Sequence, residues 1–172
     1  MALSDRDIVG LLKNRTIIIT PRIKDDQIGQ ASIDLTLSDT FWKFKQEYAK
    51  RIVDLEKVGF SEATEEIKAD KLTLRPGELV LGITREMITL PPNIMGILEG
   101  RTRYARMGLA VHVTSSIVQP GSSNRQVLEI VNMAPFPIVL HAGMRISQIV
   151  FEKLETPTSK PYSRFGKAAR KQ

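Results

Sequence analysis

The sequence predicts a single all-β domain, a sandwich or barrel with a few short helices. Short segments rich in β-branched residues and of alternating polarity recur along the chain, which is typical of antiparallel strands. Turns with Pro or Gly separate them, at residues 75–77, 90–93, 119–121 and 141–143. A length of 172 residues suits one domain with its own core and is short for two.

An N-terminal helix is expected within residues 1–14, because Ser4 can cap it and Asp5 and Asp7 suit its first turn. The expected strands cover residues 16–20, 32–37, 41–44, 79–84, 96–98, 109–114, 126–132, 138–140 and 145–152. Residues 54–70 are charged and lack a strand pattern, so we expect a surface excursion with one helical turn. Residues 157–172 are expected to form a mobile basic C-terminal tail.

Composition excludes several classes of function. Without cysteine there is no disulfide, and two histidines are too few for a zinc site of the usual nitrogen and sulfur type. No apolar run approaches the roughly 20 residues of a membrane-spanning helix. The N-terminus has no signal-peptide core, so we expect a cytoplasmic protein without membrane contact. The formal charge of +6 comes with no nucleic-acid-binding motif, so a polyanionic small ligand is expected instead.

The densest functional candidate is the segment GRTRYARMGL at residues 100–109, which holds three arginines and a hydroxyl group. A short helix over residues 102–107 would place Arg103 and Arg106 on one face. Planar guanidinium groups match phosphate oxygens, so the segment suits a triphosphate. A solvated basic helix fits the same residues equally well.

The second candidate is Glu129, in the strand expected over residues 126–132. Alternation places it between two valines on one face, while two aliphatic residues occupy the other face, so the carboxylate is expected to be partly buried. Such a group near an arginine can act as a general base, although a structural ion pair is the commoner outcome.

Other residues carry weaker signals. Asp34 is expected to be a structural acceptor near a turn or subunit contact, and His112 a satisfied core or interface histidine. Trp42, with Phe41 and Phe44, is expected to pack.

Several short fragments form an ordered set along nearly the whole chain. They are ASIDL at 31–35, LRPGE at 74–78, GRT, AR and GL within 100–109, VHVT at 111–114, PG at 120–121, LE at 128–129 and PY at 161–162. In this order they resemble the dCTP deaminase family, which includes bifunctional deaminase-dUTPase relatives. The block from residue 100 to residue 129 is the most specific part.

The resemblance implies a distorted β-barrel of the dUTPase-like β-clip type, assembled as a homotrimer with shared active sites that the tail closes. It implies dCTP or dUTP as ligand and Mg²⁺ bound through the triphosphate, with no zinc and no protein metal ligands. Glu129 would activate a water for attack at C4 of cytosine, while Thr102 and Arg106 hold the water and the carboxylate. The residues implied to bind substrate are Arg101, Thr102, Arg103, Ser115, Val118, Gln119, Tyr162 and Lys167.

Three residues depart from the family pattern. Gln119 replaces the usual Asp before Pro-Gly, Ser122 replaces the usual aromatic residue after it, and Arg103 replaces the second Ser of the family's R-S-S motif. The loss of the Asp weakens a dUTPase interpretation more than a deaminase one. We therefore expect zinc-independent deamination of dCTP to dUTP and ammonia. The alternatives are a dUTP diphosphatase and a nucleotide-binding trimer without turnover.

Overall fold

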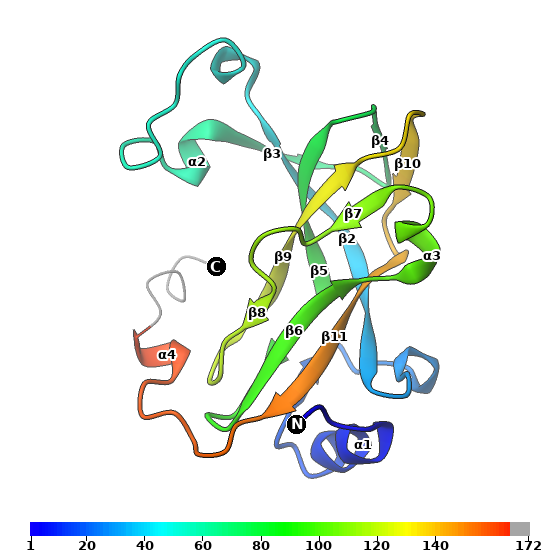
Figure 1. Ribbon diagram of the computed structural model, residues 1–172, viewed down its shortest axis with the longest axis vertical. Coiled ribbons are helices and arrows are strands. Elements are labelled where there is room, and N and C mark those ends of the chain that lie inside the picture. The colour runs from blue at the N-terminus through cyan, green and yellow to red at the C-terminus, as the bar shows by residue number, and fades with distance from the viewer. Residues whose placement is uncertain (166–172) are drawn as a thin grey trace.

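A curled antiparallel sheet organises the protein (Figure 1). The computed structural model describes residues 1–165. Its strands are β1 (Ile18–Thr20), β2 (Ser32–Phe44), β3 (Thr64–Lys68), β4 (Lys71–Leu74), β5 (Leu79–Thr89), β6 (Ile94–Gly100), β7 (Leu109–Val111), β8 (Ile117–Val118), β9 (Ser123–Asn132), β10 (Ile138–His141) and β11 (Arg145–Lys153). Its helices are α1 (Asp5–Lys13), α2 (Phe60–Ala63), α3 (Thr102–Ala105) and α4 (Tyr162–Phe165), with 3₁₀ turns η1 (Asp25–Gln27) and η2 (Gln46–Tyr48).

Nine of the strands form one sheet that follows the path β7-β9-β5-β2-β11-β6-β8, with β1 added to β5 and β3 to β2. The other two, β4 and β10, pair with each other. The strand pairs are antiparallel, and the register shifts within the pairings of β2, β5 and β11. Such irregularities bend a sheet, so it curls around its core. The expected all-β fold, a distorted β-barrel, is confirmed.

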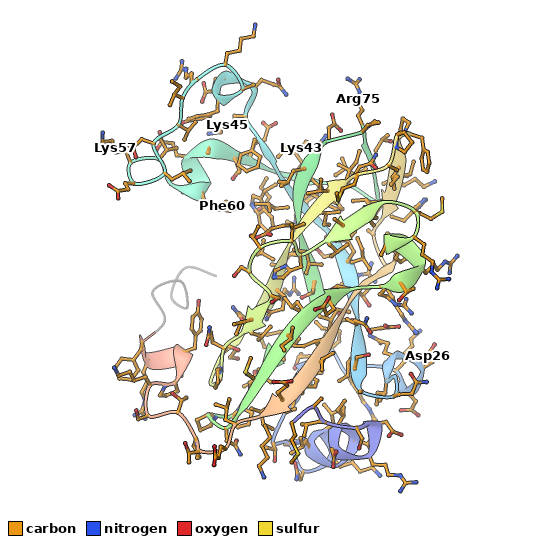
Figure 2. The ribbon with its side chains drawn as sticks, in the orientation of Figure 1. Asp26, Lys43, Lys45, Lys57, Phe60 and Arg75 are labelled. Carbon is orange, nitrogen blue, oxygen red and sulfur yellow. The ribbon has the colours of Figure 1, made fainter. Side chains whose placement is uncertain are left out.

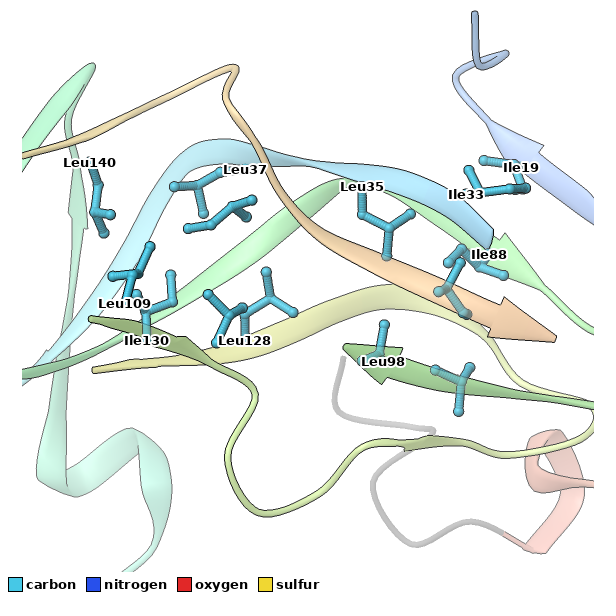
Figure 3. Close-up of a cluster of buried hydrophobic side chains, with 14 of the residues drawn as sticks. Ile19, Ile33, Leu35, Leu37, Ile88, Leu98, Leu109, Leu128, Ile130 and Leu140 are labelled. Carbon is cyan, nitrogen blue, oxygen red and sulfur yellow. The ribbon is translucent and has the colours of Figure 1, made fainter. Parts of the chain in front are cut away.

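The hydrophobic core lies inside this curl. Figure 3 shows Leu35 of β2, Leu98 of β6 and Leu128 of β9 among the side chains of one buried cluster. Leu35 and Leu128 are fully buried, and each such side chain stabilises the fold by about 1.5–3 kcal/mol relative to an exposed one. The buried core therefore stabilises the strands that carry the residues on the outer faces of the barrel.

The N-terminal helix begins as expected. Ser4 caps α1, and its backbone N–H donates to the Asp7 carboxylate at 3.0 Å. This hydrogen bond and a second one from the Ser4 hydroxyl hold the pKa of Asp7 below its ordinary value. In the described part of the chain, no helix is long and apolar enough to cross a membrane.

Several expected boundaries were wrong. The excursion over residues 54–70 contains β3 as well as the helical turn α2, because its charged Glu65 and Glu66 remain exposed on a strand that pairs with β2. The strands expected at 32–37 and 41–44 are one strand, and β4 and β8 were not expected. The strand expected to reach Thr114 ends at Val111, because His112 adopts a positive φ of 65°.

Candidate active site

Glu129 lies on the outer face of β9. Its neighbours Leu128 and Ile130 are fully buried in the core, so the alternation of the strand turns the carboxylate to the other side. There it is half-buried, as expected, beside Leu81 of β5, which is its register partner.

A groove with a volume of about 1030 Å³ opens in front of this strand face. Five residues expected at the site lie together in its lining: Ser115, Val118, Gln119, Glu129 and Tyr162. Glu129 is the only carboxylate in that lining among residues 1–165. A single acid in a groove of this size, with the apolar Leu81 and Ile83 of β5 and Val127 of β9 in the same lining, suits proton transfer to a bound organic ligand.

The Glu129 carboxylate is held by Thr114, a residue to which the sequence analysis gave no role. The Thr114 backbone N–H donates to Oε2 at 2.8 Å, and its hydroxyl lies 2.7 Å from each carboxylate oxygen. The backbone N–H of His112 donates to the main-chain carbonyl of Glu129 at 2.8 Å. The loop after β7 is therefore fastened to Glu129 through both main chain and side chain. The signal in the sequence was that Thr114 ends the VHVT fragment at 111–114, which forms part of the family resemblance.

His112 turns the chain from β7 into this loop, and it also lines the groove. Its Nε2 contacts the carbonyl oxygen of Ser115. Its Nδ1 is buried and has no hydrogen-bond partner among the described residues, so a satisfied core histidine is not what one chain shows, and the expectation of an interface histidine stays a prediction.

Aromatic residues from another part of the chain also line the groove. Trp42 of β2 and Phe60 of α2 face each other with ring centroids 6.0 Å apart. Phe60 lies at the upper left of Figure 2, on the side of the barrel that carries α4 and away from α3. Phe41 is fully buried and packs as expected, whereas Trp42 is part of the groove wall.

The arginine segment forms the short helix α3 and its flanks. Arg101 forms an ion pair with Asp34 at 2.8 Å and donates to the Arg145 carbonyl at 3.1 Å. Arg103 lies over the ring of Tyr104 at 5.7 Å. Thr102 and Arg106 are exposed, and Arg106 has no ion pair within residues 1–165. These side chains therefore have donors to offer to an anion.

Within one subunit, α3 and Glu129 are not part of the same site. No residue of segment 100–108 lines the groove, and Figure 1 shows α3 on the opposite side of the barrel from α2 and α4. The donors to Glu129 come from Thr114, and no ion pair joins it to Arg106 among the described residues. A single chain therefore does not bring Thr102 and Arg106 to the Glu129 carboxylate.

The segment after β11 places Tyr162 at the groove. The backbone N–H groups of Tyr162 and Ser163 donate to the carbonyls of Pro120 and Gly121 at 2.9 and 3.2 Å. Gly121 has a φ of 77°, and a Cβ there would lie 2.6 Å from the Pro161 Cβ, so this close packing requires glycine. Lys167, also expected at the site, lies outside the described residues.

Gln119 and Ser122, two of the three departures from the family pattern, both line the groove. Gln119 is exposed, whereas Ser122 is only 2% exposed and its hydroxyl has no partner among the described residues. In the described part of the chain, no cluster of three or more His, Asp or Glu side chains is arranged to hold a metal ion.

Comparison with known proteins identifies the family. A family model described as dCTP deaminase-like matches residues 2–154. A dCTP deaminase of Marinomonas sp. strain MWYL1 is 41% identical over 173 residues, which cover 95% of this chain and 89% of the relative. A dCTP deaminase of Pectobacterium atrosepticum is 39% identical over 174 residues, which cover 95% and 90%.

A solved structure gives the same answer for the fold. The crystal structure of 2′-deoxycytidine 5′-triphosphate deaminase from Agrobacterium tumefaciens superposes with a TM-score of 0.68 at 21% identity. The match covers 88% of this chain and 47% of that one, so the chain spans about half the length of that protein. With the family match over most of its length, this chain belongs to the dCTP deaminase-like family.

Proposed function

We propose that the protein converts dCTP to dUTP and ammonia with Glu129 as the general base. One observation carries the proposal: Glu129 is the only carboxylate in the described groove lining, and Thr114 fixes its oxygens. Two relatives named dCTP deaminase, 39% and 41% identical over 95% of the chain, support this choice of substrate.

The reaction replaces the amino group on C4 of cytosine by the oxygen of water. As the water oxygen bonds to C4, Glu129 moves one proton from it to N3 of the ring. Glu129 then moves the proton of the new C4 hydroxyl group to the amino nitrogen, the C4–N bond breaks and ammonia leaves. The ring keeps C4=O and N3–H, which is uracil. Thr114 supports these steps by holding the carboxylate in one orientation.

The active site is shared between subunits of a homotrimer. One subunit supplies the groove and Glu129, and its neighbour supplies α3, where Arg106 and Thr102 hold the water and the carboxylate. This arrangement is supported by the position of α3 on the far side of the barrel and by the donors that it leaves unpaired. Residues of complementary function on opposite faces of one subunit meet when the subunits form a closed ring.

The substrate spans both parts of the site. Arg101, Thr102 and Arg103 of the neighbouring subunit bind the phosphates, and main-chain groups near Ser115 and Val118 read the base. Gln119 borders the sugar, and Tyr162 lies at the edge of the site. Mg²⁺ would accompany the triphosphate and would neutralise part of its charge. It would be held through the substrate, because the described groove lining offers a single carboxylate.

A product assay tests the proposal. Purified protein with Mg²⁺ is incubated with dCTP, dUTP or CTP, and ammonia, pyrophosphate and the nucleotide formed are measured. We expect ammonia from dCTP with dUTP retained. Conversion of dUTP to dUMP and pyrophosphate without ammonia would replace the proposal with a dUTP diphosphatase, and binding without any product would replace it with a nucleotide-binding trimer.

A further inference from the structure

Arg101 differs from the other arginines of its segment in how firmly it is held. Its guanidinium forms an ion pair with Asp34 at 2.8 Å and donates to the Arg145 carbonyl at 3.1 Å. Arg103 and Arg106 are exposed and have no carboxylate partner among residues 1–165. Only Arg101 is therefore fixed before a ligand arrives.

The backbone around Arg101 is fixed as well. The Gln148 side chain donates to the Gly100 carbonyl at 3.0 Å, and the Ser147 hydroxyl donates to the Glu99 carbonyl at 2.8 Å. Asp34 lies opposite Gln148 on the neighbouring strand β2. Both the chain and the side chain of Arg101 are thus held against the sheet.

This arrangement leaves the guanidinium able to bind an anion. A guanidinium group has five N–H donors in a rigid fork, and Asp34 and the Arg145 carbonyl engage one on each terminal nitrogen. The Arg101 side chain is 32% exposed, whereas that of Asp34 is 15% exposed. Solvent therefore reaches the arginine side of the pair more than the carboxylate side.

The environment of Asp34 disfavours the charged form of its carboxyl group. Burial raises its pKa above the ordinary value even though Arg101, and more weakly Arg145, favour its charged form. The folded protein therefore holds the charged Asp34 at a cost, as is common for buried ion pairs.

We propose that Asp34 is a positioning residue that holds the Arg101 guanidinium in the orientation in which it receives the substrate triphosphate. The inference rests on the proposed function, because that function makes Arg101 a phosphate ligand. A preoriented arginine loses less side-chain freedom on binding, so the effect of Asp34 belongs to substrate affinity and not to the chemical step.

The test compares Asp34→Asn with Asp26→Asn as matched control. Asp26 is also an aspartate in an ion pair with an arginine, but its partner is Arg145, at 2.7 Å, and its side chain is 69% exposed. For Asp34→Asn we expect the KM for dCTP to rise about tenfold, or about 1.4 kcal/mol, with kcat within about twofold. Asp26→Asn should leave both within about twofold, because exposed ion pairs contribute little. An unchanged KM in Asp34→Asn, or an equal rise in both variants, overturns the proposal.

Two further measurements separate positioning from a general structural effect. In Arg101→Lys, adding Asp34→Asn should raise KM no further, since Asp34 acts through Arg101, and an additive rise overturns the proposal. Calorimetry with inorganic tripolyphosphate should show the same weakening in Asp34→Asn without any turnover. If wild-type protein releases no ammonia, the proposed function fails. The binding of tripolyphosphate then still tests whether Asp34 positions Arg101, because that measurement does not depend on turnover. If Asp34→Asn does not fold, Asp34→Glu, which displaces the carboxylate, must also raise KM.

Discussion

A shared active site predicts that two inactive variants restore each other when their subunits are mixed. Glu129→Gln keeps the side-chain shape and removes the proposed base. Arg106→Ala removes an exposed side chain that has no ion pair within residues 1–165, so the barrel should stay folded. Each pure variant should release ammonia from dCTP at near-background rates.

The size of the recovery follows from the geometry of the site. Because α3 lies across the barrel from the groove, a working site needs Glu129 from one subunit and Arg106 from its neighbour. After random exchange of equal amounts, half of the subunits carry each group, so about one quarter of the sites regain both. Ammonia release should therefore reach about one quarter of the wild-type rate.

The assay uses subunits with two different tags, exchanged by co-expression or refolding, and measures ammonia at saturating dCTP. The control mixes either variant with the double variant Glu129→Gln, Arg106→Ala, which lacks both groups and should restore nothing. If the two single variants form mixed oligomers but stay inactive, the site is not shared between these residues and the reasoning from α3 fails.

Three further predictions follow from individual contacts. Thr114→Val removes the hydroxyl donor to Glu129, so kcat should fall about tenfold, which corresponds to about 1.4 kcal/mol. Thr114→Ser keeps the hydroxyl, and its kcat should stay close to wild type. Equal kcat values in the two variants would contradict the positioning of Glu129 by Thr114. Gly108→Ala should lower the free energy of unfolding by about 3 kcal/mol, because φ is 80° and a Cβ would lie 2.8 Å from the Ala134 backbone nitrogen. Gly10→Ala, with open space around its Cβ in α1, should leave the melting temperature unchanged or raised, and equal melting shifts would refute this account of Gly108. Burial raises the folded-state pKa of Asp34 above 3.8, so its stabilising contribution is complete below 3.8 and is lost as pH rises through the raised value. As pH rises through this range, the free energy of unfolding measured by urea titration should fall in wild type relative to Asp34→Asn. A rise in wild type relative to the variant would contradict the raised pKa.

The sequence predicted the features that depend on local pattern. Alternation along residues 126–132 predicted a partly buried Glu129 on the face opposite Leu128 and Ile130, and the structure buries those two side chains fully. The turn at Gly121 and the cap at Ser4 were also visible, since both depend on the conformational preferences of one or two residues.

Contacts between distant segments were not visible in the sequence. Thr114 holds Glu129 only because β7 ends at Val111, and the loop that begins at His112 folds back over β9. Strand β3 was missed because its polarity does not alternate: Glu65 and Glu66 are consecutive and both are exposed. Asp34 and Arg101 meet because β2 and β6 flank β11 in the sheet, and this order follows from the folded topology.

The turnover of Glu129→Gln with dCTP tests the central claim most directly. The amide fills the same space but cannot accept the proton of water at C4, so ammonia release should fall to background. Binding of dCTP, measured by calorimetry, should stay within about tenfold of wild type, or about 1.4 kcal/mol. Ammonia release near the wild-type rate from a trimer of Glu129→Gln subunits would show that another group moves the proton.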